Sequence, residues 1–324
     1  MTIRNLYPPE LLHHPDPGSL DPDLKFGIII KVTSEIFNNC YRRCVSYIEP
    51  HEDVSSRRLP NPDYEDIVFS LIGENDHAYY HFVLEYALGL FKKRPTTEQL
   101  QESKILLFDK RYDFKKQWLK ILFPSLTDNN FIRFEIGNEI YCKKLIPCGR
   151  FMGLPIQMRS CETVCIEANE QIRRNLSLSK TKPKTMLLIK RTHSRGIDCW
   201  HEIHQICLDY CSKHGLKLDV FDDSVDLGTV ETQLRRFNAA KIIIGGHGAA
   251  YINLLACSHL TTLIEFRGDR PELEFSKQDP PMYKKLCRYL GMKYHNIHVE
   301  NHLVSIPEVK NCLDNIDNEN ITQT

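Results

Sequence analysis

Four short apolar runs in the C-terminal half constrain the fold more than any other feature of the sequence. They begin about 20 to 30 residues apart, which is the length of a βαβ crossover unit, and helical patterns fill the gaps between them. Each run is almost entirely apolar, as is typical of parallel strands whose sheet is covered by helices on both faces. The runs predict strands at residues 185–190, 216–221, 241–244 and 261–266. This half is therefore expected to form a Rossmann-like α/β domain.

The N-terminal half shows the same alternation of strands and helices with less regular spacing. Strands are predicted at residues 26–32, 66–72 and 104–109, with a further strand pair at 131–136 and 140–146. Helices are predicted at residues 79–93, 114–123 and 162–178. The first 25 residues and residues 50–65 are rich in proline and charge, so we expect loops there. Alternating strands and helices indicate a second α/β domain.

A polar and charged run at residues 177–184 separates the two halves, and we place the domain boundary there. The expected domains are residues 1–178 and residues 179–324, two Rossmann-like units in tandem with a cleft between them. The tail carries one more predicted helix at 281–290 and a strand at 297–300, and it is free to pack back on the first domain. A length of 324 residues agrees with two domains of ordinary size.

The composition is that of an ordinary globular protein and excludes several classes. The chain has 42 basic residues (lysine plus arginine) and 42 acidic residues (aspartate plus glutamate). It therefore lacks the excess of basic residues that is typical of nucleic-acid binding. No apolar run approaches the roughly 20 residues that cross a bilayer, and no signal-peptide pattern follows Met1. We therefore expect a soluble protein, with the cytoplasm and a microbial or virus-encoded origin favoured. Sequons at Asn175 and Asn320 keep the secretory-pathway lumen open, if the chain is a trimmed luminal domain.

The 12 cysteines are expected to be reduced and mostly buried. Three pairs lie four residues apart, which on a helix places both thiols on one face: Cys40 and Cys44, Cys161 and Cys165, Cys207 and Cys211. This spacing is not the C-x2-C of a zinc knuckle. A zinc module would need four residues at helical spacing, His201, His204, Cys207 and Cys211. One helix rarely encloses four ligands, so this module is the weakest alternative.

The strongest local signal is a glycine-rich turn within residues 242–253. A strand runs directly into Gly245, Gly246 and Gly248 and then into a predicted helix. Glycines let the backbone turn sharply and approach a ligand, and the free N–H groups of the new helix face an anion such as pyrophosphate. His247 is not required there by packing and could donate a hydrogen bond to a phosphate or a sugar hydroxyl. A tight turn without a ligand is the alternative.

The same segment is similar to the dinucleotide-binding fingerprint, and Glu265 ends the next strand, where a ribose ligand would lie. However, Tyr251 occupies the place of the third glycine, and the turn comes late in the chain. An NAD-dependent oxidoreductase is therefore kept as an alternative.

Positive charge follows the strand at 185–190, where Lys190, Arg191 and Arg195 lie at the carboxyl edge of the predicted sheet. Ligands of α/β proteins bind at this edge, and arginine holds phosphate oxygens in a fork. A solvated basic loop explains this stretch alone equally well. The glycine turn is a second feature at a strand end that is suited to binding an anion. Together, the turn and the basic residues favour a phosphate site.

A pair of titratable residues lies in the N-terminal half. On the predicted helix at 79–93, His81 and Glu85 are neighbours one turn apart. Either side chain could take a proton from an acceptor hydroxyl. A surface contact without catalytic meaning is the alternative.

Together these segments resemble glycosyltransferase family 61, over roughly residues 66–267 and most densely over residues 230–255. The family pattern there is a glutamate-containing helix, an alanine, a strand, H-G-A, an asparagine and a closing I-E. Matching positions are Glu231, Gln233, Ala240, His247, Gly248, Ala249, Asn253 and Glu265. The family's paired arginines match Arg191 and Arg195, and its Y-Y-H-x-x-x-E motif matches Tyr79, Tyr80, His81 and Glu85. Ala78 and Asp198 stand where the family usually has asparagine.

The resemblance implies the GT-B architecture, with the acceptor bound by the first domain and the nucleotide sugar by the second. It implies inverting, metal-independent transfer of a sugar of the xylose, N-acetylglucosamine or arabinose class from a nucleotide diphosphate donor, which we expect to be UDP-linked. The acceptor would be a hydroxyl of a glycan or glycoprotein. No metal or cofactor is expected besides the nucleotide sugar, and the sequence does not determine the oligomeric state.

The same resemblance suggests the roles of individual residues. Glu85 or His81 would be the catalytic base, and arginines with helix N–H groups would stabilise the leaving diphosphate. The expected donor-binding residues are Arg191, Arg195, Gly246, His247, Gly248, Ala249 and Asn253, with Glu231 and Glu265 as candidates for ribose or sugar hydroxyls. A catalytically silent glycan-binding module of the same fold is the remaining alternative.

Overall fold

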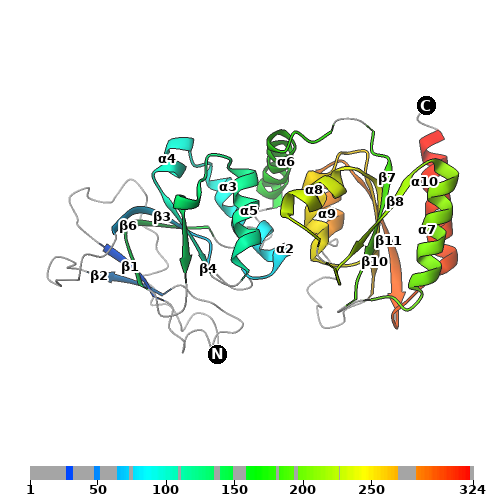
Figure 1. The fold of residues 1–324 in the computed structure, drawn as a ribbon, viewed down its shortest axis with the longest axis horizontal. Coiled ribbons are helices and arrows are strands. Elements are labelled where there is room, and N and C mark those ends of the chain that lie inside the picture. The colour runs from blue at the N-terminus through cyan, green and yellow to red at the C-terminus, as the bar shows by residue number, and fades with distance from the viewer. Residues whose placement is uncertain are drawn as a thin grey trace.

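Two six-stranded sheets with a layer of helices between them make up the computed structural model (Figure 1). The model describes residues 27–31, 47–51, 64–72, 76–108, 111–134, 139–148, 158–179, 182–192, 196–225, 227–268 and 282–321. The predicted loop at residues 1–25 lies outside these ranges. The chain is therefore an α/β protein, as the sequence indicates.

The first sheet has the strand order β2-β1-β6-β3-β4-β5. Its strands are β1 (Gly27–Lys31), β2 (Tyr47–His51), β3 (Tyr64–Ser70), β4 (Lys104–Phe108), β5 (Phe131–Phe134) and β6 (Glu139–Pro147). The strands from β6 to β5 run parallel, and β1 is antiparallel to both β6 and β2. Part of the predicted loop at 50–65 is therefore strand, and the edge position of β2 tolerates Pro50.

The predicted pairing of the strands at 131–136 and 140–146 with each other is wrong. Both segments are strands, but β5 continues the parallel ladder of β4 at the sheet edge, whereas β6 lies between β1 and β3. Sequence neighbours do not become sheet neighbours here because each strand takes the partner that extends a parallel ladder.

The second sheet has the order β12-β11-β10-β9-β7-β8. Its strands are β7 (Thr185–Lys190), β8 (Lys217–Asp222), β9 (Ala240–Gly246), β10 (Thr262–Arg267), β11 (Lys293–Glu300) and β12 (Leu303–Val304). All are parallel except β12. The four apolar runs of the sequence are confirmed as strands, and β11 begins before the predicted strand at 297–300. The side chains of β9 and β10 are almost completely buried, as expected for a sheet covered on both faces.

The helices between the sheets share one apolar core that includes residues from both halves of the chain. From the first half come α2 (Tyr79–His81), the π-helix η3 (Phe82–Ala87), α3 (Leu88–Lys93), α4 (Thr97–Gln101), α5 (Tyr112–Leu122) and α6 (Met158–Asn175). The short 3₁₀-helix η4 (Asp128–Asn130) leads directly into β5. From the second half come α8 (Val230–Asn238), η6 (Ala249–Ala256) and α9 (Met282–Tyr289). Contacts of α5 with α8, of α6 with α9, and of α2 with η6 join the halves. The strand ends that carry the sequence motifs are therefore held close to helix α2.

The last helix, α10 (Ile306–Ile321), packs with α7 (Trp200–His214) on the face of the second sheet that is turned away from the first sheet (Figure 1). Its apolar residues Val309, Leu313 and Ile316 are buried there in a second core. Helix α10 therefore packs on the second sheet, because its apolar stripe joins the buried residues of α7 and of the strands, whereas α9, earlier in the tail, contacts α6 of the N-terminal half. The domain boundary itself stays a prediction.

The described cysteines are free thiols, and six of them are buried, as expected. Burial raises the pKa of Cys257 to about 12 and that of Cys207 to about 12, so these thiols stay protonated. Within the described ranges, no helix is both long enough and apolar enough to span a bilayer.

An ion pair joins the carboxyl ends of β7 and β8 and gives a testable pH dependence. Hydrogen bonds from Lys190, at 2.7 Å, and from Ser224 lower the pKa of Asp222 to about 2. Because the pKa is lowered, the pair stabilises the fold above about pH 4 and is lost as the pH falls towards 2. Asp222→Asn should therefore show a shallower loss of the free energy of unfolding between pH 4 and 2.

Urea unfolding at several pH values measures this dependence. The exposed Asp314→Asn on α10 is the matched control, since it should keep the wild-type slope. An unchanged slope in Asp222→Asn would show that solvent screens the pair completely.

Candidate active site

Close packing requires glycine at two positions of the turn at the end of β9. Gly245 has a φ of 148°, and a Cβ there would overlap the carbonyl oxygen of Ile189 on the adjacent strand β7. A Cβ on Gly248 would overlap the guanidinium group of Arg191. The predicted helix after the turn is the 3₁₀-helix η6, which leaves its first N–H groups without helical acceptors. The turn therefore exposes backbone donors at the carboxyl edge of the sheet.

His247 is held in place by a buried carboxylate. Its Nδ1 lies 2.5 Å from Oε1 of Glu265, and Oε2 of Glu265 accepts a hydrogen bond of 2.7 Å from the Tyr294 hydroxyl. Glu265 is completely buried on β10. Burial, together with the neighbouring Glu265 charge, raises the pKa of Tyr294 well above its usual value. Tyr294 therefore stays a neutral donor, and this network fixes the orientation of the imidazole.

Aromatic rings pack around the turn. The Tyr283 hydroxyl donates to the carbonyl of Gly248 at 2.7 Å, and the Tyr251 hydroxyl donates to the carbonyl of Gly245 at 2.7 Å. The Tyr283 ring contacts Tyr80, Tyr251 and His247, with centroid distances of 5.7, 5.2 and 5.3 Å. The residue that replaces the third glycine of the fingerprint, Tyr251, is therefore a structural part of the turn.

The opposite wall comes from the N-terminal half, where α2 and η3 form one continuous helical segment. Nδ1 of His81 lies 2.8 Å from Oε1 of Glu85, which confirms the pairing predicted from their spacing. The segment is a π-helix from Phe82 to Ala87, a geometry that is frequent at functional sites. Burial raises the pKa of Tyr80 well above its usual value. This tyrosine therefore stays neutral.

Two interactions fix the start of this helical segment. The Tyr79 hydroxyl donates to Oδ1 of Asn253 at 2.9 Å, across 174 positions of sequence. Nζ of the fully buried Lys115 lies 3.3 Å from Oδ2 of Asp76, directly before the helix. It also donates to the carbonyl of Phe108 at 3.1 Å. The hydrogen bond between Tyr79 and Asn253 therefore connects the two halves of the site, and Lys115 fixes the N-terminal wall.

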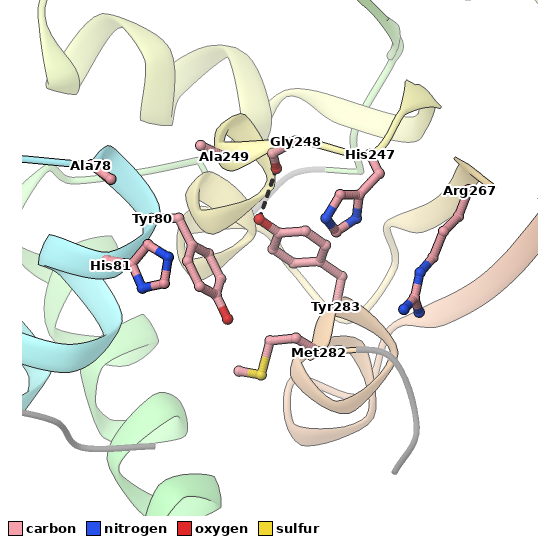
Figure 2. Close-up of a pocket in the computed structure, with 9 residues that line it drawn as sticks. All are labelled: Ala78, Tyr80, His81, His247, Gly248, Ala249, Arg267, Met282 and Tyr283. Atoms are coloured by element: carbon pink, nitrogen blue, oxygen red, sulfur yellow. Dashed lines mark hydrogen bonds between the residues drawn. The ribbon is translucent and has the colours of Figure 1, made fainter. Parts of the chain in front are cut away.

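A cavity of about 380 Å³ lies between the two walls (Figure 2). Its lining residues are Ala78, Tyr80, His81, His247, Gly248, Ala249, Arg267, Met282 and Tyr283. The imidazoles of His81 and His247 reach it from opposite sides (Figure 2). None of these lining residues carries a carboxylate, so the cavity suits an anion.

The structure places the basic residues of the second half as follows. Arg191 follows β7 and lies behind Gly248, with its Nε 3.0 Å from Oδ2 of Asp223. Asp223 also accepts hydrogen bonds from the backbone N–H and hydroxyl of Thr192, at 2.7 and 2.6 Å. Lys190 is occupied by Asp222. Arg195 lies outside the described residues.

Four other predicted donor-binding residues do not line the cavity: Gly246, the last residue of β9, and Asn253, Glu265 and Glu231. Asn253 is fully buried, and it accepts from Tyr79 and donates to Gln233 at 3.4 Å. Glu265 is fully buried behind His247. Glu231 is an exposed residue of α8 that binds Arg235 on the same helix. Burial thus leaves Asn253 and Glu265 no side-chain surface for a ligand, and Glu231 does not line the cavity.

Sequence reasoning missed Arg267, Met282, Tyr283 and Tyr294. Arg267 could have been found, because it is the last residue of β10 and so lies at the carboxyl edge beside the glycine turn. The others lie on α9 and β11, whose sequences carry no motif.

The zinc alternative has no support in the described residues. No group of three or more histidine, cysteine, aspartate or glutamate side chains that could hold a metal ion occurs among them. Cys207 and Cys211 lie on the buried face of α7, whereas His201 lies on its exposed face. Helical spacing therefore does not bring the four proposed ligands together.

Comparison with known proteins supports the sequence resemblance. The model of glycosyltransferase family 61 matches residues 79–264, which is more than half of the chain. No curated protein matches the sequence at a significant level. The matched segment begins at Tyr79, in the wall that carries His81 and Glu85, and includes the glycine turn. It thus includes residues of both walls of the cavity, and the chain belongs to glycosyltransferase family 61.

Proposed function

We propose that this glycosyltransferase moves a sugar from a nucleotide diphosphate donor, UDP-linked, to a hydroxyl of a glycan or glycoprotein. The transfer inverts the anomeric carbon and uses no catalytic metal. The observation that carries the proposal is the cavity in which His81, from the N-terminal motif, faces His247 and the glycine turn. We propose further that the two sheets are the two domains of a GT-B enzyme, residues 1–178 and 179–324, with the acceptor on the side of the first.

In this reaction the acceptor oxygen attacks the anomeric carbon while the bond from that carbon to the diphosphate oxygen breaks. His81 is the general base, because it lines the cavity whereas Glu85 does not. Glu85 holds Nδ1 of His81, which leaves Nε2 to take the hydroxyl proton. Attack from the face opposite the leaving group gives the inverted product.

Charge on the leaving diphosphate is stabilised at the turn of the second sheet. The first N–H groups of η6, at Ala249 and Ala250, have no acceptor among the described residues, and the helix dipole favours an anion there. Arg191, next to Gly248, adds positive charge, and His247 contacts the donor. Divalent cations prefer carboxylate ligands, and the lack of any carboxylate in the described lining supports a metal-independent reaction.

A thermal-shift screen of UDP, GDP, CMP and their sugars tests the donor class. We expect UDP to stabilise the protein, by about 2.7 kcal/mol at 100 times its dissociation constant. The UDP-sugars that bind should then be hydrolysed slowly, and EDTA should leave this hydrolysis unchanged. Arg191→Ala and His247→Ala should both lower turnover.

Each other outcome points to a named alternative. Stabilisation by NAD alone would favour the oxidoreductase. Binding of oligosaccharide without release of UDP from any donor would indicate a silent glycan-binding module. Loss of activity in EDTA would overturn the metal-independent mechanism, and full turnover in both variants would overturn the site.

A further inference from the structure

Two arginines occupy equivalent positions on the strands that flank the glycine turn. In the second sheet, β9 lies between β10 and β7. Phe266 of β10 pairs with Gly246, and Ile189 of β7 pairs with Gly245. Continuing both registers places Arg267 on one side and Arg191 on the other, each level with His247. Neighbouring strands are about 4.8 Å apart, so the two arginine backbones lie roughly 10 Å apart across the turn.

The two arginines differ in how their charges are compensated. The carboxylate of Asp223 lies 3.0 Å from Nε of Arg191, and the guanidinium packs against Gly248. Arg267 forms no ion pair with any carboxylate of the described chain. Glu265, two residues earlier on β10, is already bound by His247 and Tyr294. One carboxylate therefore faces the charge of Arg191, whereas no carboxylate of the described residues faces the charge of Arg267.

The side chain of Arg267 is placed to bind a ligand in the cavity. Its side chain lines the cavity beside His247 and Tyr283 (Figure 2). A guanidinium is planar and always charged, and it binds phosphate oxygens through two parallel hydrogen bonds. A diphosphate that leaves without a metal ion needs such compensation on more than one side.

We propose that Arg267 binds the diphosphate of the donor from the side of the turn opposite Arg191. The inference rests on the proposed function, since it takes the cavity as the donor site. It assigns the principal ligand-directed charge to a residue beyond the segment that the family model matches.

Titration with inorganic pyrophosphate and with UDP tests the proposal. Pyrophosphate isolates the phosphate contacts because it has no base or sugar. Arg267→Gln removes the charge but keeps most of the side-chain length, and it should weaken both ligands about 10- to 100-fold. Arg267→Lys keeps the charge but loses the paired hydrogen bonds of the guanidinium group, so its affinity for both ligands should lie between those of Arg267→Gln and wild type. Arg288→Gln, an exposed arginine of α9 that stacks on Tyr289, is the matched control and should bind as wild type does.

The outcomes separate this inference from the function on which it rests. If UDP and pyrophosphate bind Arg267→Gln as tightly as wild type, the inference is wrong and the proposed function stands. If pyrophosphate binds and Arg267→Gln weakens it, but no nucleotide binds, the phosphate site stands and the nucleotide donor is wrong. If wild type binds neither ligand, both fail. Circular dichroism melting of each variant shows whether a loss of binding reflects a loss of fold.

Discussion

Replacing His81 with glutamine is expected to lower kcat by about 10²- to 10⁴-fold, the usual contribution of a general base. The imidazole lines the cavity, and Glu85 holds its Nδ1 at 2.8 Å, so only Nε2 can take the acceptor proton. Glutamine keeps a polar side chain of similar reach but cannot accept that proton. The affinity for UDP should stay unchanged, because this residue belongs to the wall opposite the glycine turn.

Steady-state kinetics at saturating donor and acceptor measure the loss. His201→Gln, an exposed histidine on the outer helix α7, is the matched control and should keep full activity. Glu85→Gln should lower kcat less than His81→Gln does, because it leaves the base in place and removes only the carboxylate that orients it. The reverse order, with His81→Gln nearly active and Glu85→Gln inactive, would make the carboxylate the base and overturn our assignment.

Gly245→Ala is expected to lower the free energy of unfolding by roughly 2–6 kcal/mol, from backbone strain together with overpacking. Gly245 has a φ of 148°, a conformation that other residues rarely adopt, and an added Cβ would overlap the carbonyl oxygen of Ile189 on β7. A loss of this size is a large part of the stability of an ordinary domain. The turn that carries His247 would be displaced with it.

Urea unfolding measures this effect, and Gly215→Ala separates its two causes. Gly215 ends α7 with a φ of 62°, and a Cβ there would meet no atom within 4 Å. This control therefore measures backbone strain alone and should cost about 1 kcal/mol. Equal losses in the two variants would mean that β7 moves aside freely, and that close packing does not restrict the turn.

Local patterns predicted the second sheet well. The strands β7 to β10 agree with prediction within two residues. Three of them, β7, β9 and β10, are short apolar runs buried on both faces, whereas β8 at the sheet edge is only partly buried. The pairing of β5 and β6 was wrong, because pairing depends on which edge is free and not on proximity in the chain. Helix α10 was missed, although its apolar residues Val309, Leu313 and Ile316 recur at helical intervals.

The site was only partly predictable. His81 with Glu85 and the turn at His247 were found because their spacing or their glycines are visible in the sequence. The burial of Asn253 and Glu265 was not predictable, since it depends on Tyr79 and Tyr294, which lie far from them in the chain. A polar residue in a motif can therefore support a neighbour and have no surface for a ligand.

Local sequence patterns are sufficient to predict the α/β class, the glycine turn and the helical pair His81 and Glu85. Apolar periodicity, the need for glycine at a crowded turn and the rise of a helix act over a few residues, so they can be read from a short segment. Only the tertiary structure decided that His81 and His247 share a cavity and that Arg267 lines it. These contacts join distant segments, and they depend on sheet register and side-chain packing, which no local pattern contains.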